Sequence, residues 1–289
     1  MNATRDCLRC LSLGVFLTCL SALAHAKTTP IKVFLLGGQS NMLGRAQVSG
    51  LPIELQGTQK DVLFIGGSNG TAGTTLEFLR PDGKESDEFG PEVTFGRTIA
   101  NLNPGTDIAL IKYAASGTNL SSSWNPTTGV EYAKFLETVT NGLSELTNAN
   151  YAPEIIGMLW HQGESDVGQT QANYQTMLTG FIGDVRSRYG ANLPFMIGEI
   201  RNTGPDAQQI INAQSAVAAA DPYASFVAGS DLTFGDSVHF DAAGMTTLGE
   251  RFANNYQANY GYLVPEPSTL MLFGLGGICL IKRRRRLQN

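Results

Sequence analysis

Short apolar runs that alternate with helical patterns constrain the fold of this 289-residue chain more than any other feature. The runs occupy residues 31–36, 107–113, 155–160 and 194–200, with a weaker one at 225–228. A strand that is covered on both faces appears as a continuous apolar run. Apolar residues with helical spacing lie between or after these runs, at 135–146, 174–185 and 245–256. The alternation predicts one α/β domain, with a central parallel sheet and helices on both of its faces.

The segment 44–92 interrupts this alternation, because it is rich in glycine and in charged residues. We interpret it as a long excursion from the sheet, with one short strand at 62–65. Long loops in compact domains often bind ligands. A solvated insertion without a function is an equally open interpretation.

The first 26 residues have the pattern of a secretory signal peptide. Arg5 and Arg9 precede an apolar run at 11–23 that is too short to span a bilayer, and Ala-His-Ala at 24–26 is a small-x-small cleavage site. We therefore expect a signal peptide at 1–26, removed before Lys27. An uncleaved anchor is the alternative.

The central part of the chain, residues 27–263, is acidic and lacks cysteine. All four cysteines lie outside it, so it has neither a disulfide nor a thiol ligand for a metal. The formal net charge of −5 for the whole chain becomes about −10 once both ends are removed, because the ends carry seven of the 20 basic residues and two of the 25 acidic ones. Such a domain is not expected to bind nucleic acid.

A turn of two glycines after the first predicted strand leads into Gln39, Ser40, Asn41 and Met42. Ligands of parallel α/β sheets bind at the carboxyl ends of the strands, where Ser40 is expected to lie. If a helix begins there, its free N–H groups would favour negative charge beside the serine. The alternative is that Ser40 merely caps a helix.

An aspartate and a histidine three residues apart, Asp236 and His239, supply the partners that a nucleophilic serine needs. A serine hydroxyl is weak at neutral pH until a neighbouring base accepts its proton. An aspartate on the other ring nitrogen fixes the tautomer of such a histidine. His161 is the competing base, but it has no aspartate at this spacing, and we favour His239.

Polar segments follow two further predicted strands. Gly117 comes after the strand at 107–113, and Gln162 comes after the strand at 155–160. A backbone N–H at Gly117 and a side-chain amide at Gln162 are both groups that can donate to an oxyanion. Each segment is weak evidence alone, but together they predict a hydrolytic site at one sheet edge.

These sequence motifs, in this order, resemble those of the SGNH hydrolases. Their residues are similar to those of the carbohydrate esterase family 6 and sialate O-acetylesterase branch. They are Gly-Gln-Ser-Asn-Met at 38–42, Ser-Gly-Thr at 116–118, His-Gln-Gly-Glu-Ser-Asp at 161–166 and Asp-x-x-His at 236–239. The resemblance covers about residues 31–260. It implies a three-layer, flavodoxin-like fold and hydrolysis of acetyl esters on a carbohydrate, with neither a metal nor another cofactor.

The resemblance also implies a role for each matching residue. Ser40 becomes the nucleophile, His239 its base and Asp236 the group that orients the base. The oxyanion hole would comprise Ser40, Gly117 and Gln162, although an asparagine fills the third position in the wider superfamily. Support or substrate contact is expected of the remaining matches, which are Gln39, Asn41, His161 and Glu164. A lipase-like or thioesterase-like enzyme and a non-catalytic carbohydrate-binding protein remain alternatives.

The end of the chain, residues 264–289, resembles the PEP-CTERM sorting signal of Gram-negative bacteria. Pro-Glu-Pro at 265–267 precedes an apolar run at 270–281 and then Lys-Arg-Arg-Arg-Arg at 282–286. The run is shorter than the roughly 20 residues of a spanning helix, and the basic cluster would remain cytoplasmic. The resemblance implies transient retention in the inner membrane, processing by an exosortase and export to the cell surface or beyond. A plain tail anchor is the alternative.

Overall fold

The computed structural model describes residues 28–81 and 87–261. The predicted signal peptide and the predicted sorting tail both lie outside these residues. Within them, the chain forms a seven-stranded sheet in the order β4-β3-β6-β1-β7-β8-β9. Its strands are β1 (Thr29–Gly38), β3 (Gln59–Ser68), β4 (Glu77–Leu79), β6 (Ile108–Ala114), β7 (Tyr151–His161), β8 (Phe195–Gly198) and β9 (Ala224–Val227).

The sheet is parallel except at one edge, where β4 runs antiparallel to β3. The central strand β1 pairs in parallel with β6 on one side and with β7 on the other. All of its residues from Val33 to Gly38 are buried. The five predicted apolar runs all correspond to strands, and the predicted parallel α/β architecture is confirmed.

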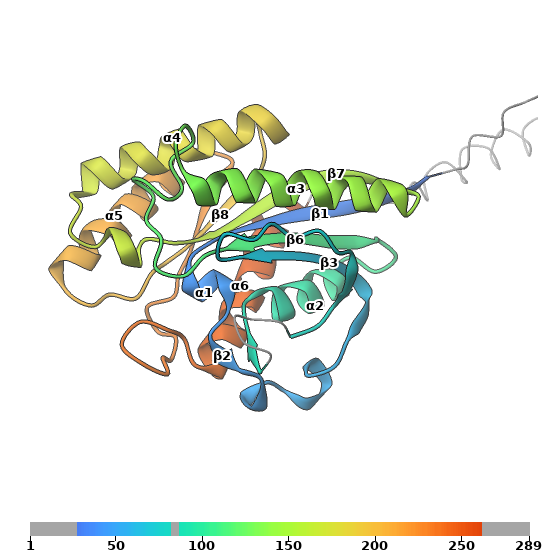
Figure 1. Ribbon diagram of the computed structural model, residues 1–289. Coiled ribbons are helices and arrows are strands. Elements are labelled where there is room, and N and C mark those ends of the chain that lie inside the picture. Colours follow the sequence, from blue (N-terminus) through green and yellow to red (C-terminus); the bar gives the residue numbers. More distant parts are fainter. Residues whose placement is uncertain (1–27, 82–86, 262–289) are drawn as a thin grey trace, which may run out of the picture.

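Helices cover both faces of the sheet (Figure 1). One face is covered by α3 (Val130–Asn148), α4 (Gln171–Tyr189) and α5 (Pro205–Ala220), and the other by α2 (Glu92–Leu102) and α6 (Ala242–Tyr260). Each face has its own buried apolar core. The three predicted helical patterns correspond to α3, α4 and α6. The sequence analysis did not predict α2 or α5. Helix α5 is mainly alanine and glutamine, with few large apolar residues, whereas α2 was overlooked although Val93, Phe95 and Ile99 lie on its buried face.

The interpretation of 44–92 as an excursion with one short strand was wrong in part. The strand β3 is ten residues long and pairs with β6, so it belongs to the main sheet. Its Val62 and Phe64 pack in the core beneath α2, while Ile65 faces the opposite core. The alternation between the two faces was not recognised in the sequence, because two glycines near the end of β3 interrupt the apolar pattern. The other elements of the segment are short: α1 (Ser40–Leu43), β2 (Ala46–Gln47), two 3-10 turns (Val48–Gly50 and Ile53–Leu55) and β5 (Glu88–Phe89).

The sheet brings the predicted site residues to one edge. Ser40 follows β1, Gly117 follows β6, and Gln162 follows β7, all at the carboxyl ends of adjacent parallel strands. Asp236 and His239 lie on the segment between β9 and α6. Crevices at this edge are where parallel α/β sheets bind their ligands.

Candidate active site

Ser40 is the first residue of α1, directly after the end of β1. The turn between them depends on Gly38, whose φ of +151° is unfavourable for other residues. A Cβ at Gly38 would lie 2.1 Å from the carbonyl oxygen of His161. The backbone N–H of Gln39 donates to this same oxygen at 3.0 Å. The close approach of β1 and β7 therefore fixes where Ser40 lies.

Ser40, His239 and Asp236 form a continuous hydrogen-bonded chain. His239 Nε2 lies 3.0 Å from Ser40 Oγ, and His239 Nδ1 lies 2.7 Å from Asp236 Oδ2. The other carboxylate oxygen of Asp236 accepts the backbone N–H groups of Val238 and His239, each at 2.7 Å. These contacts hold aspartate and imidazole in one tight turn, which the three-residue spacing had predicted.

The carboxyl group of Asp236 is ionised throughout the ordinary pH range. Partial burial alone would raise its pKa, but hydrogen bonds from the backbone and ring of His239 and from the backbone of Val238 together lower that pKa to about 2. An ionised carboxylate accepts a hydrogen bond from the N–H at Nδ1 of His239, which leaves Nε2 as an acceptor. This is the tautomer in which His239 can take a proton from Ser40.

Ser40 opens into a cavity of about 380 Å³. Gly117 and Glu164 lie in its wall together with His239. Gly117 has a φ of +70°, a conformation that glycine adopts without strain. Within the described residues, neither the N–H of Gly117 nor that of Ser40 has a hydrogen-bond partner. Both are available to an oxygen atom bound in the cavity.

The Gln162 side chain does not have the position expected of an oxyanion donor. It is fully buried, and its amide nitrogen lies 2.6 Å from Asp166 Oδ2 and 3.1 Å from the carbonyl oxygen of Thr118. It is not among the residues that line the Ser40 cavity. The buried carboxyl group of Asp166 needs donors, and Gln162 supplies one. Gln162 therefore braces the loop that carries Gly117 rather than facing the cavity.

Gln39 and Asn41 hold neighbouring segments in place. Gln39 Oε1 accepts the backbone N–H of Ser165 at 3.3 Å and the amide of Gln162 at 3.2 Å. Asn41 Nδ2 donates to Glu164 Oε1 at 2.7 Å and to the carbonyl oxygen of Val238 at 3.1 Å. Asn41 thus ties α1 to the segment that carries His239.

His161 and His239 have different surroundings. His161 is fully buried, its Nε2 lies 3.1 Å from the carbonyl oxygen of Glu199, and it does not line the Ser40 cavity. Its Nδ1 lies 3.6 Å from Glu164 Oε1. Glu164 itself lines the cavity, on the 3-10 turn Glu164–Asp166. Its Oε2 atom is buried and has no partner in the described part of the chain.

Arg45 is a site residue that the sequence reasoning missed. It lies in the wall of the Ser40 cavity and also in that of a neighbouring cavity of about 370 Å³, which His239 and Asp236 line as well. Its guanidinium is 3.6 Å from the carboxylate of Glu88. A single arginine after a turn carries no distinctive pattern, so only the fold identifies it.

No group of three or more His, Cys, Asp or Glu residues within 28–81 and 87–261 is arranged to hold a metal ion. None of the helices in these ranges combines the length and hydropathy that a bilayer span requires.

Comparisons with protein families give two matches. Residues 30–258 match the model of a carbohydrate esterase family described as sialic acid-specific acetylesterase. Residues 263–286 match the PEP-CTERM protein-sorting motif. A search of curated proteins finds no match.

Solved structures share the fold at low sequence identity. A protein from Arabidopsis thaliana superposes with a TM-score of 0.66 and 20% identity, over 80% of this chain and 100% of that one. A carbohydrate acetylesterase from Xanthomonas citri gives 0.58 and 16%, over 79% of this chain and 57% of the other. NanS gives 0.57 and 12%, over 80% and 98%. These similarities concern the fold.

Proposed function

This chain belongs to the carbohydrate esterase family of sialic acid-specific acetylesterases, and we propose that it hydrolyses acetyl esters on sugars with Ser40 as nucleophile. The observation that carries the proposal is the chain of contacts from Ser40 through His239 to Asp236, at 3.0 and 2.7 Å. A serine, a base and an orienting carboxylate in this geometry are what acyl transfer requires.

The proposed reaction has two halves. Ser40 Oγ attacks the acetyl carbonyl carbon while His239 Nε2 takes the hydroxyl proton. His239 then gives that proton to the sugar oxygen as its bond to the acetyl carbon breaks, which leaves acetyl-Ser40 and a free sugar hydroxyl. Water repeats the attack with the same base, acetate leaves, and the proton returns to Ser40.

The developing oxyanion would be held by two backbone donors. The N–H groups of Ser40 and Gly117 have no partner in the described part of the chain and border the same cavity. Donors aimed at developing charge are usually the largest catalytic contribution in such sites. We assign Gln162 to support of the Gly117 loop, because its amide already contacts Asp166 and Thr118.

A small acyl group suits the cavity better than a long one. Its lining contains a single aliphatic side chain, that of Val238, beside polar residues such as Glu164 and Ser165. A lipase-like or thioesterase-like enzyme would instead need an extended apolar groove for its acyl chain. The cavity wall therefore favours acetyl over fatty acyl esters.

We also propose that the enzyme acts outside the cytoplasm. The PEP-CTERM motif at residues 263–286 supports export of a Gram-negative bacterial protein through exosortase processing. The signal peptide predicted at 1–26 would direct the chain into the same route. Acetylated carbohydrate at the cell surface or beyond would then be the substrate.

The test is acetate release from a panel of acetylated sugars, comprising xylan, mannan and sialic acid esters, with 4-nitrophenyl acetate as a small reference ester. We expect wild-type protein to release acetate and Ser40→Ala to lose at least about a thousandfold in kcat/KM. If the wild type binds glycans but releases no acetate from any ester, the protein is a carbohydrate-binding member of the fold and the esterase proposal fails.

A further inference from the structure

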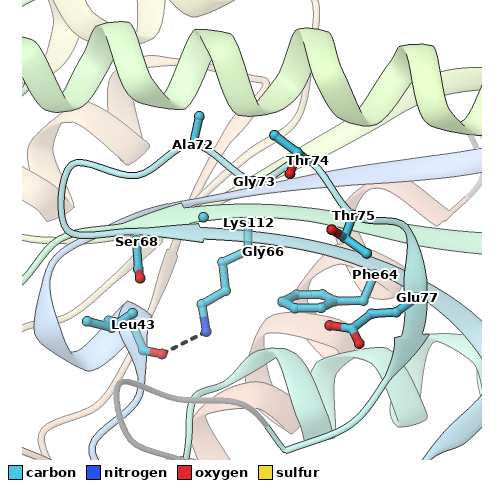
Figure 2. Close-up of a pocket in the computed structure, with 11 residues that line it drawn as sticks. Leu43, Phe64, Gly66, Ser68, Ala72, Gly73, Thr74, Thr75, Glu77 and Lys112 are labelled. Carbon is cyan, nitrogen blue, oxygen red and sulfur yellow. Dashed lines mark hydrogen bonds between the residues drawn. The ribbon is translucent and has the colours of Figure 1, made fainter.

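A separate cavity of about 280 Å³ opens beneath the carboxyl end of β3 (Figure 2). Its wall is polar, with the hydroxyl groups of Ser68, Thr74 and Thr75, the carboxylate of Glu77 and the ammonium of Lys112. The ring of Phe64 adds an apolar surface. The volume is at the small end of the range for ligand pockets. None of these residues has a part in the proposed ester chemistry.

Lys112 gives this cavity a donor that is already desolvated. Its side chain is 2% exposed, and its Nζ donates to the carbonyl oxygen of Leu43 at 2.8 Å and to Glu92 Oε2 at 2.7 Å. An ammonium group has three hydrogens, so one remains without an acceptor in the described part of the chain. Its direct neighbour on β3 is Gly66, and the ring of Phe64 lies over this glycine, where an added Cβ would be 2.8 Å from Phe64 Cε1. Phe64 and Lys112 therefore form the inner wall of the cavity together.

The cavity adjoins the proposed active site. Leu43 lines it, and Leu43 lies three residues after Ser40 on α1, about 5 Å away along the helix axis. On the other side, the Asn69 side chain accepts the backbone N–H of Ser116 at 2.9 Å. Ser116 lines the Ser40 cavity, and Ser68 lines this one. The two hollows are therefore neighbours along one sheet edge.

The chemistry of the wall matches an uncharged, hydroxyl-rich ligand. Lys112 is compensated by Glu92, and Glu77 lies 3.3 Å from Arg80, so neither sign of charge dominates. Phe64 is only 2% exposed, so binding of a pyranose ring would depend on hydrogen bonds between the sugar hydroxyls and the donors and acceptors of the wall. A charged ligand would have to displace one of these ion pairs, at a cost in desolvation.

We propose that this cavity is a subsite for an unesterified sugar unit of the same glycan chain whose acetyl group is attacked at Ser40. The inference rests on the proposed esterase function and makes it more specific: the substrate is an oligosaccharide or polysaccharide rather than a free acetylated monosaccharide. Contacts to a remote part of a substrate improve catalysis only when that part is present.

The test compares Thr75→Tyr with wild type on acetylated oligosaccharides of increasing length and on 4-nitrophenyl acetate. Thr75 is exposed at the cavity wall, so tyrosine fills the cavity without disturbing the core. We expect kcat/KM to rise with chain length in the wild type. In Thr75→Tyr the value for the longest oligosaccharide should fall about tenfold or more, as loss of one or two hydrogen bonds implies, while 4-nitrophenyl acetate is hydrolysed at an unchanged rate.

Thr140→Tyr is the matched control, because Thr140 is exposed on α3 and lines neither cavity. It should behave as wild type on every ester. The subsite is contradicted if Thr75→Tyr and Thr140→Tyr have the same oligosaccharide kinetics, or if the wild type hydrolyses 4-nitrophenyl acetate but gains nothing from chain length. Failure of the esterase proposal is recognised separately, because the wild type would then release acetate from no ester.

Discussion

The contact between Asp236 and His239 was predictable because these two residues are three apart in the sequence. Asp236 and His239 lie on one turn in which the aspartate accepts two backbone N–H groups and the imidazole. A separation of three residues suffices for this. The contacts of the Gln162 amide were not predictable, because nothing in the sequence indicates that Asp166 is the buried acceptor it meets.

The two histidines should respond differently to substitution. We expect His239→Ala to lower kcat/KM for 4-nitrophenyl acetate by at least about a thousandfold, because the base is lost. His161→Ala should lose less than about tenfold in kcat/KM but should unfold at lower denaturant concentration, since it removes a fully buried ring. Steady-state kinetics and urea unfolding check both variants. Similar, mild losses of activity in the two would contradict the assignment.

At the scale of whole elements, the apolar runs predicted the strands well, whereas the helical patterns predicted α3, α4 and α6 but neither α2 nor α5. The length of β3 was underestimated, because Gly66 and Gly67 near its end are residues typical of a loop. Helix packing was also invisible in the pattern. Where α6 crosses α2, Gly249 allows an approach so close that an added Cβ would lie 2.1 Å from Thr94 Oγ1 and 2.4 Å from the carbonyl oxygen of Pro91.

Alanine substitutions at a tightly packed and at an open helical glycine should change the free energy of unfolding in opposite directions. Gly249→Ala should lower the free energy of unfolding by about 2 kcal/mol, because the added methyl group overpacks the contact between α2 and α6. Gly183→Ala on α4 meets nothing within 4 Å and should raise it by about 0.5–1 kcal/mol, since alanine is the better helix former. Urea unfolding of both variants measures the difference. Equal effects would show that the close approach is not tight.

At the scale of the whole molecule, the sequence predicts separate tasks for the two ends and the central domain. The domain match covers residues 30–258, and the sorting motif covers 263–286. The distribution of charged residues along the sequence already shows an acidic centre and a basic tail. The boundaries at 26 and 263 remain predictions, because they fall where the structure describes nothing.

Removal of both ends should leave the enzyme intact but change its destination. We expect residues 27–263 to fold and to hydrolyse 4-nitrophenyl acetate with the kcat/KM of the exported protein. In a bacterium with an exosortase, the full chain should reach the cell surface or medium, while a chain without 264–289 should not follow the same route. Cell fractionation with activity measurements distinguishes them. The predicted division into a catalytic domain and two targeting ends would be contradicted if residues 27–263 were inactive. It would also be contradicted if both chains were found in the same cell fractions.

The most direct test of the central claim is to find the acetyl group on Ser40 during turnover. Wild-type protein is mixed with an acetyl ester, quenched in acid within the first turnovers and digested, and the peptides are analysed by mass spectrometry. Ser40→Ala serves as the matched control. The account predicts one acetyl group on the peptide that contains Ser40, and none on that peptide in the variant. Rapid acetate release by the Ser40→Ala protein, or acetylation at another residue that is required for turnover, would contradict it.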